Sequence, residues 1–478
     1  MSLILLESLR VWWPECLLSA GALLVIIVGV WFRRRHLTDG VAWASLVAGA
    51  WALWKTPAAP ATGAFFGLIL CDPFSLAFRW LALGVTALVL LMVMGSRETT
   101  RHHGEYLGLL LLLAVGLMVM AEANHLLMAY VAMELVSLSG YLLVGFLEEP
   151  RSAEAALKYL LFGALSSAVM LFGMSLLVGV TGQMAFPDIR FASAGLDGGH
   201  TSALLAAVTL MLVGLAFKIS MVPFHMWTPD AYEGAPMAVA ALLSVGPKAA
   251  GFALLLRLLE AFRPAWPQLV PLVLGLTVMT MTLGNLVALV QTNVKRLLAY
   301  STIAQVGYLL IGVTSDSRLG LEALLVYLVA YLFMNLGAFA CAAAVADETG
   351  SESLEAFKGL AARSPGLALA CALFLLSLAG IPPLFGFLGK FLLFGSALEA
   401  GRMWLAVAGV VNSAIALYYY VNLIRLMYFV GPPHRAPLHV APALRVALVV
   451  CAAATLGLGL FPSAVLVLVG GASTVQLF

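Results

Sequence analysis

The chain alternates between long apolar stretches and short polar connections. The apolar stretches, each of about 14 to 27 residues, begin near residues 16, 41, 74, 107, 125, 155, 204, 238, 268, 297, 321, 366, 403 and 441. A helix that crosses a bilayer needs about 20 mostly apolar residues. The pattern therefore predicts an all-α polytopic membrane protein with about 14 transmembrane helices. The longest connections are 186–201 and 347–365, so we expect no soluble catalytic domain.

Composition excludes a water-soluble globule. Of the 478 residues, 63% are hydrophobic and 10% are charged, whereas soluble domains carry about 25% charged residues. A net charge of +2 gives no basic surface for nucleic acid, so we expect no nucleic-acid partner. The five cysteines lie far apart in the sequence without CxxC spacing, which predicts core residues and no metal or cofactor in this chain.

Basic residues in the connections predict the orientation, because positively charged loops stay in the cytoplasm. The first apolar stretch is followed by Arg33, Arg34 and Arg35 and not by a cleavage site, so we expect it to be retained. One set of alternate connections holds 11 lysines and arginines, and the other set, with the termini, holds 7. This bias places the N-terminus outside, and an even number of helices then places the C-terminus outside as well.

Four charged residues interrupt apolar stretches. They are Glu134, Lys218, Lys248 and Lys390, each in a different predicted helix. A charge at mid-bilayer costs about 2.5–3.5 kcal/mol on insertion scales, and such residues usually face the protein interior or an aqueous cavity. The residues predict a polar or proton-conducting path. Ion pairs that only hold helices together are the alternative.

Prolines accompany the three lysines: Pro223 follows Lys218 by five residues, Pro247 directly precedes Lys248, and Pro382 and Pro383 precede Lys390. A proline removes a backbone donor and frees a carbonyl. Within a membrane, such breaks are tolerated where protein or water satisfies the freed groups. Broken helices beside buried charge are typical of a transporter's central site, although proline is also common in membrane helices generally.

Further polar residues are weaker candidates for the same path. His225 lies seven residues after Lys218, on roughly the same helical face, but a core histidine is an equal alternative. Lys158 is a possible relay residue, or it forms a rim ion pair with Glu154 four residues earlier. Other residues either line water or make polar helix contacts; they are Tyr300, Ser301, Thr302, Gln305, Asn412, Tyr418, Tyr419, Asn422 and Arg425.

Four segments resemble one protein family. They are EAALKYLLFGALSSAVMLFGMSLLVGVTG (154–182), AFKISMVPFHMWTPDAYEGAP (216–236), TLGNLVALVQTNVKRLLAYSTIAQVGY (282–308) and GIPPLFGFLGKF (380–391). They are similar to the antiporter-like membrane subunits of the proton-pumping NADH-quinone oxidoreductase, respiratory complex I. VPFHMWTPDAYEGAP together with SVGPK (244–248) favours the subunit N branch of this family.

The resemblance implies a detailed organisation. Fourteen helices contain two inverted five-helix repeats, helices 4–8 and 9–13, with helices 7 and 12 broken. The expected divisions are 1–104, 105–262, 263–432 and 433–478. Glu134 pairs with Lys218, and Lys248 and Lys390 continue the proton relay. When the pair separates, burial favours release of the lysine's proton. The tenth helix has no counterpart of Glu134, so the repeats are chemically unequal.

The resemblance also implies a cellular setting. The chain is expected in the bacterial plasma membrane, in contact with lipid, sibling antiporter-like subunits and the other membrane and peripheral subunits of complex I. NADH, FMN, iron–sulfur clusters and quinone belong to partner subunits. Two alternatives stay open: a subunit of a multi-subunit sodium/proton antiporter, and a scaffold whose buried charges serve assembly.

Overall fold

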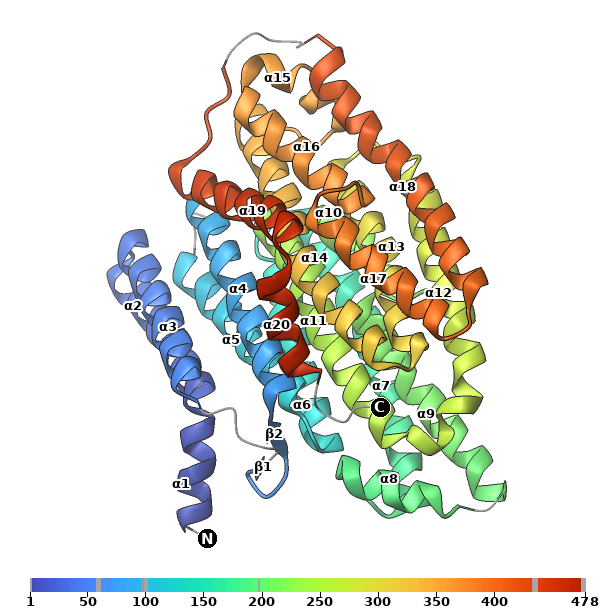
Figure 1. The fold of residues 1–478 in the computed structure, drawn as a ribbon. Coiled ribbons are helices and arrows are strands. Elements are labelled where there is room, and N and C mark those ends of the chain that lie inside the picture. The colour runs from blue at the N-terminus through green and yellow to red at the C-terminus, as the bar shows by residue number, and fades with distance from the viewer. Residues whose placement is uncertain are drawn as a thin grey trace.

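The computed structural model is a tilted bundle of helices in which α11 and α14 lie between the N-terminal helices and the helices around α18 (Figure 1). The structure describes residues 2–56, 62–96, 98, 102–196, 198–431 and 437–473. The elements of the first half are α1 (Ser2–Val11), α2 (Trp13–Phe32), α3 (Arg35–Lys55), β1 (Thr62–Ala64), β2 (Ile69–Cys71), α4 (Pro73–Gly95), α5 (His103–Glu122), α6 (Leu126–Val144), α7 (Pro150–Thr181), α8 (Phe186–Ala194), α9 (Gly198–Ile219), α10 (Trp227–Gly234) and α11 (Met237–Ala261). Those of the second half are η1 (Arg263–Ala265), α12 (Trp266–Ala288), α13 (Val294–Ser315), α14 (Arg318–Thr349), η2 (Leu354–Phe357), α15 (Leu360–Arg363), α16 (Pro365–Ala379), α17 (Phe385–Glu399), α18 (Met403–Phe429), α19 (Pro442–Leu460) and α20 (Ser463–Ala472).

Membrane-spanning helices dominate the fold, as the apolar pattern predicts. Among the described residues, 12 helices are long and apolar enough to cross a membrane. The apolar segment of α11 is entirely buried and those of α13 and α14 are 94% and 89% buried, whereas those of α2 and α19 are only 28% buried. The central helices are therefore surrounded by protein, while the outer helices leave apolar faces exposed.

Two helices are interrupted where the prolines predict it. α9 ends before Pro223 and α10 begins after it, and α16 and α17 are separated by Pro382 and Pro383. Pro247 behaves differently, because α11 continues through it. The proline still removes one intrahelical hydrogen bond from α11.

Some connections contain structure that the hydropathy pattern does not reveal. The chain is nearly, but not wholly, helical, because β1 and β2 form an antiparallel hairpin in which Thr62 pairs with Cys71. Helix α8 lies within the predicted loop 186–201, and η2 and α15 lie within 347–365. These elements are too short to stand out by hydropathy. Of the 11 basic residues in the predicted cytoplasmic connections, Arg97, Arg101 and Arg435 lie outside the described residues.

Candidate functional site

Glu134 and Lys218 lie near one another but are held by serines. Lys218 is fully buried, and its ammonium donates a 2.7 Å hydrogen bond to Ser137 Oγ. The hydroxyl of Ser167 on α7 donates to Glu134. Ser137 lies three residues after Glu134 and so on the same face of α6, and Glu134 still acts electrostatically on Lys218. The direct ion pair expected between the two is not formed in this structure.

An aromatic layer lies beside Lys218 and reaches Lys248. Trp227 stacks on Tyr159 with ring centroids 4.1 Å apart, and its indole nitrogen donates to the Phe217 carbonyl across the break after α9. Lys248 Nζ lies 4.7 Å from the centre of the Trp227 ring. A Cβ at Gly251 would lie 3.6 Å from Lys218 Cγ, so the Lys218 stem contacts α11 one turn from Lys248.

The ammonium of Lys248 binds the backbone carbonyl that Pro247 leaves without a hydrogen-bond donor. In an unbroken helix the amide of residue 247 would bond to the Leu243 carbonyl, but proline has no N–H. Lys248 Nζ donates to that carbonyl at 3.0 Å and to the Tyr232 hydroxyl at 2.8 Å. Lys248 is fully buried, so these contacts stand in for water around its ammonium.

A polar face of α13 continues from Tyr232. Ser301, Thr302 and Gln305 are 0–1% exposed, and their spacing places them on one face of the helix. Thr302 lies beside the Tyr232 hydroxyl and accepts from Tyr331 at 2.9 Å. Gln305 accepts from the Tyr327 hydroxyl. This stripe links the surroundings of Lys248 to those of Lys390.

Tyr420 of α18 closes the stripe on its other side. Its hydroxyl lies 2.5 Å from Ser301 Oγ and accepts from Gln305 at 3.3 Å. The same Gln305 amide donates to the Leu378 carbonyl at 3.2 Å. The Leu378 carbonyl also accepts a hydrogen bond from Lys390, so it connects the stripe directly to that lysine.

Lys390 repeats the arrangement found at Lys248. The carbonyls of Leu378 and Ala379 would accept from residues 382 and 383, which are both prolines. Lys390 Nζ donates to these carbonyls at 3.0 and 3.2 Å, and it lies 4.3 Å from the centre of the Tyr308 ring. Of Lys218, Lys248 and Lys390, two are therefore bound by carbonyls that prolines leave unpaired.

Polar groups extend beyond Lys390 toward α12 and α18. Ser413 accepts from Lys390 at 3.3 Å. Asn285 donates to Tyr308 at 3.1 Å and to Asn412 at 3.2 Å. Asn285 is fully buried and Asn412 is 4% exposed, so the polar chain continues through the packed interior.

Several weaker candidates lie elsewhere. Tyr418 is 66% exposed on the outer face of α18, because the buried face of this helix carries Tyr419 and Tyr420. The structure therefore does not bring Tyr418 together with the buried polar residues of α13. Tyr300 is partly buried at the edge of the α13 stripe. His225 is half-buried in the break between α9 and α10, and its Nδ1 has no hydrogen-bond partner.

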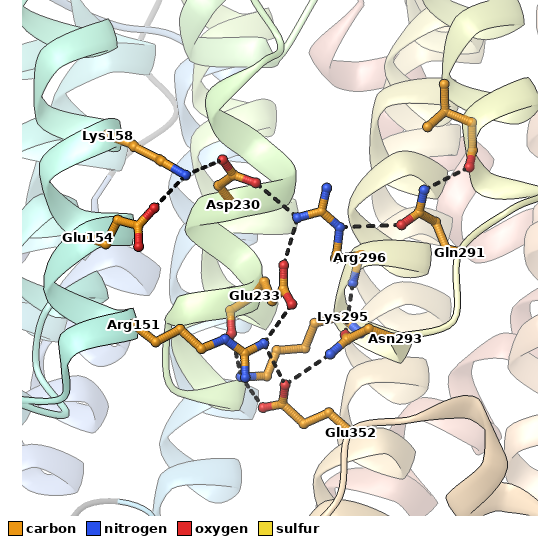
Figure 2. A network of polar contacts seen from close by, with 11 residues as sticks. Arg151, Glu154, Lys158, Asp230, Glu233, Gln291, Asn293, Lys295, Arg296 and Glu352 are labelled. Carbon is orange, nitrogen blue, oxygen red and sulfur yellow. Dashed lines mark hydrogen bonds and ion pairs between the residues drawn. The ribbon is translucent and has the colours of Figure 1, made fainter.

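Lys158 joins an ion-pair network whose members do not include Lys218, Lys248 or Lys390 (Figure 2). Its ammonium lies 2.8 Å from Glu154 and 3.0 Å from Asp230. Asp230 also pairs with Arg296 at 2.9 Å. The remaining charged members are Arg151, Glu233, Lys295 and Glu352. The network ties α7, α10, α13 and the segment after α14, so it fastens the broken helix to both halves of the chain.

Glu98 fixes the start of the central helix. Its carboxylate accepts from the Met237 amide, the first of α11, at 2.7 Å, and an acidic group is favourable at a helix N-terminus. Burial raises the pKa of Glu98, with the charge of Lys295 opposing the shift. The connection between α4 and α5 thereby positions the helix that carries Lys248.

A second group of buried charges escaped the sequence analysis. Arg79 donates to both carboxylate oxygens of Glu15 at 2.8 and 2.7 Å and pairs with Glu122 at 3.0 Å. Arg257 binds Asp72 through two hydrogen bonds of 2.8 and 2.7 Å. All five are at most 4% exposed. The signal that selected Glu134, a charge within an apolar stretch, also exists for Glu15 and Arg79.

The other residues of the polar chain are uncharged, so no charge within an apolar stretch marks them in the sequence. Tyr232, Asn285, Tyr327, Tyr331 and Tyr420 are buried polar residues in helices that contain many others. Among the described residues, no three His, Cys, Asp or Glu side chains form a group that could hold a metal ion.

Known proteins resemble this chain over most of its length. A relative from Sorangium cellulosum, NADH-quinone oxidoreductase subunit N 2, is 43% identical over 91% of this chain and 92% of its own length. A Trichlorobacter lovleyi protein, NADH-quinone oxidoreductase subunit N, is 41% identical over 96% of both chains.

Solved structures share the fold. A chain of respiratory complex I from Thermus thermophilus is 34% identical, with a TM-score of 0.80 over 95% of this chain and 98% of its own. A chain of the Mrp complex from Dietzia has a TM-score of 0.84 over 98% of this chain and 97% of its own, at 24% identity, which supports likeness of fold alone. The family described as "NADH:quinone oxidoreductase/Mrp antiporter, TM" matches residues 123–416. This match, together with sequence identity above 40% to the two relatives over most of their length, shows that the chain belongs to that family.

Proposed function

We propose that this chain is a proton-translocating membrane subunit of an NADH-quinone oxidoreductase. Its relay consists of Glu134, Lys218, Lys248 and Lys390. The observation that carries the proposal is the polar connection from Lys248 through Tyr232 and the α13 stripe to the carbonyl that Lys390 also binds. A chain of exchangeable groups inside a membrane protein is suited to moving protons.

Each lysine in the relay holds a proton that neighbouring groups can release or accept. Lys218 changes partner between Ser137 and the Glu134 carboxylate, and the carboxylate stabilises the charged lysine more strongly because charge-assisted hydrogen bonds are stronger. Between Lys218 and Lys248 the structure has aromatic rings instead of a hydrogen-bonded chain. We propose that water enters this segment when Trp227 moves and carries the proton between the two lysines.

The lining groups of the relay are Ser301, Thr302, Gln305 and Asn412. Their burial and hydrogen bonds support this role. Lys158 and Tyr418 are left out, since Lys158 is neutralised by Glu154 and Asp230 at the rim and Tyr418 faces outward. His225 and Tyr300 are assigned to the ends of the path.

The driving energy comes from partners. Each proton moved against a membrane potential requires about 2.3 kcal/mol per 100 mV. We assign NADH, FMN, iron–sulfur clusters and quinone to partner subunits, and conformational coupling to the sibling membrane subunits that contact this chain.

We further propose 14 crossings in two inverted five-helix repeats. Counting each broken pair as one crossing, the first repeat is α5, α6, α7, α9–α10 and α11, and the second is α12, α13, α14, α16–α17 and α18. The fourth crossing is broken in both sets, which supports the correspondence. The division at 262/263 falls between α11 and η1, and 104/105 falls within the first turn of α5, whereas 432/433 lies outside the described residues.

The excess of basic residues in one set of connections supports outer, periplasmic termini in a bacterial plasma membrane. The end of the bundle that carries Arg33, Arg34 and Arg35 is then cytoplasmic. Protease protection of tags at both termini in sealed vesicles tests this orientation.

Lys390→Arg in the assembled complex tests the relay. Arginine keeps the positive charge but holds its proton permanently, so we expect NADH-driven proton pumping to fall while assembly is retained. Lys218→Ala, which removes a carrier, is expected to have the same effect. Normal pumping by an assembled Lys390→Arg complex would contradict the role of this lysine.

A sodium/proton antiporter subunit is the second candidate, because the family description also covers Mrp antiporters. Vesicles containing the complex distinguish the two candidates. Sodium-driven proton movement without NADH oxidation would favour the antiporter, whereas movement strictly dependent on NADH oxidation favours the proposed function.

A further inference from the structure

A basic cavity opens at one end of the N-terminal helices, away from the buried lysines. Its volume is about 410 Å³, and it lies between the end of α2, the start of α3 and the start of α5. The turn from α2 to α3 lies at the upper left in Figure 1. The lining includes three consecutive arginines, Arg33, Arg34 and Arg35.

The three arginines differ in their freedom to bind a ligand. Arg35 is half-buried and anchored, since it donates to the carbonyls of Val93 and Ser96 at 2.8 and 3.1 Å. Arg33 and Arg34 are exposed and form no ion pair with any described residue. Glu105 also lines the cavity, but its carboxylate lies 3.3 Å from His102 Nδ1. Two guanidinium groups therefore remain available to an anion.

The backbone at the cavity favours an anion as well. Arg35 is the first residue of α3, and His103, Gly104 and Glu105 form the first turn of α5. The first amides of a helix have no partner within the helix, and its dipole attracts negative charge. Gly29 and Gly104 bring α2 and α5 together, because a Cβ at Gly29 would lie 2.7 Å from Gly104 Cα. The two helices thus form a closely packed wall beside the arginines.

An apolar stripe leads away from the cavity along α2. Val30 lines the cavity and is 52% exposed. Ile27 and Leu23 continue on the same helical face and are 53% and 60% exposed. A basic cavity joined to an exposed apolar stripe matches a molecule with an anionic head and hydrocarbon tails.

We propose that this cavity binds the phosphate headgroup of an anionic membrane lipid, with the lipid's acyl chains lying along Leu23, Ile27 and Val30. Arg33 and Arg34 bind the phosphate and select against zwitterionic lipids. Basic pockets between transmembrane helices bind lipid headgroups in this way. The site is separate from the proton relay and does not depend on it.

Photo-crosslinking in the assembled complex tests the proposal. The complex is reconstituted into phosphatidylcholine bilayers containing increasing fractions of phosphatidylglycerol with a photoreactive group near the top of one acyl chain. We expect saturable crosslinks to α2 at Leu23–Val30, read by peptide mass spectrometry. A phosphatidylcholine probe with the same photoreactive group should give weak, unsaturable labelling.

Charge variants separate a specific site from general attraction. One basic residue near a membrane surface contributes about 1 kcal/mol, so Arg33→Gln with Arg34→Gln should raise the half-saturating lipid fraction about 30-fold. Arg10→Gln with Lys55→Gln removes equal charge at the C-terminal ends of α1 and α3, outside the residues that line the cavity, and should leave the half-saturating fraction unchanged. Arg33→Lys with Arg34→Lys should retain most binding.

Three crosslinking results would overturn the proposal. In the first, the phosphatidylcholine probe crosslinks as strongly as the phosphatidylglycerol probe. In the second, the variant with both arginines changed to glutamine has an unchanged half-saturating lipid fraction. In the third, the probe crosslinks to a peptide of a neighbouring subunit that fills the cavity. Competition by inorganic phosphate at millimolar concentration, with no difference between the two lipid probes, would identify a free-phosphate site instead and so exclude the lipid.

Discussion

The ammonium of Lys218 donates a 2.7 Å hydrogen bond to Ser137, one helical turn beyond Glu134 on the same helix. Glu134 is meanwhile bound by Ser167 of α7. The two serines therefore satisfy the lysine and the carboxylate separately. We infer that the proposed ion pair forms when Lys218 and Glu134 exchange these two serines for each other.

Ser137→Ala is expected to lower NADH-driven pumping about tenfold or more with little loss of assembly. Hydrogen bonds to charged groups contribute about 1.5–3 kcal/mol, so the variant loses the arrangement in which Lys218 is apart from Glu134. Ser166→Ala is the control, since among the described residues the Ser166 hydroxyl bonds only to the Phe162 carbonyl of its own helix. Pumping and NADH oxidation are measured together in inverted vesicles. Equal effects of both variants would contradict the switching role of Ser137.

Pro247→Ala is expected to strengthen α11 and yet weaken pumping. Proline within a helix costs about 3 kcal/mol relative to alanine, so the substitution favours the helix. The restored amide competes with Lys248 for the Leu243 carbonyl, which now lies 3.0 Å from Nζ. Pro271→Ala makes the same change inside α12, on an exposed face, and should leave pumping intact. A Pro247→Ala complex that pumps normally would show that the freed carbonyl is dispensable.

The sequence predicts the charged part of the site better than the polar part. Glu134 and the three lysines are visible because each interrupts an apolar stretch, and the prolines mark the carbonyls that Lys248 and Lys390 bind. Helix facing is less visible, since α18 is apolar around most of its circumference and carries three consecutive tyrosines. Pairing is not visible at all, because contacts such as Asn285 with Tyr308 depend on tertiary packing.

Tyr420→Phe and Tyr418→Phe are expected to differ, although the residues are two positions apart. The Tyr420 hydroxyl contacts Ser301 and Gln305, so its removal interrupts the stripe and should reduce pumping several-fold. Tyr418 is 66% exposed and should tolerate the change. Both substitutions remove one hydroxyl, which makes the comparison of pumping rates at equal assembly direct. Equal rates in the two variants would remove Tyr420 from the path.

Arg79→Met is expected to prevent assembly and not merely reduce pumping. Arg79 forms ion pairs with both Glu15 and Glu122 in a buried site, and removing one partner of a buried ion pair costs about 3–5 kcal/mol because the other charge is left uncompensated. Arg318→Met, which breaks only an exposed pair with Glu322, should assemble normally.

The same argument predicts a rescue. Adding Glu15→Gln and Glu122→Gln to Arg79→Met removes the uncompensated charges, so assembled complex on native gels should recover. Because the relay residues are untouched, the rescued complex should also pump. Rescue of assembly without pumping would instead assign these buried charges to the proton path, and failure of the triple variant to assemble would show that the shape of Arg79, including its bond to the Val11 carbonyl, matters more than its charge.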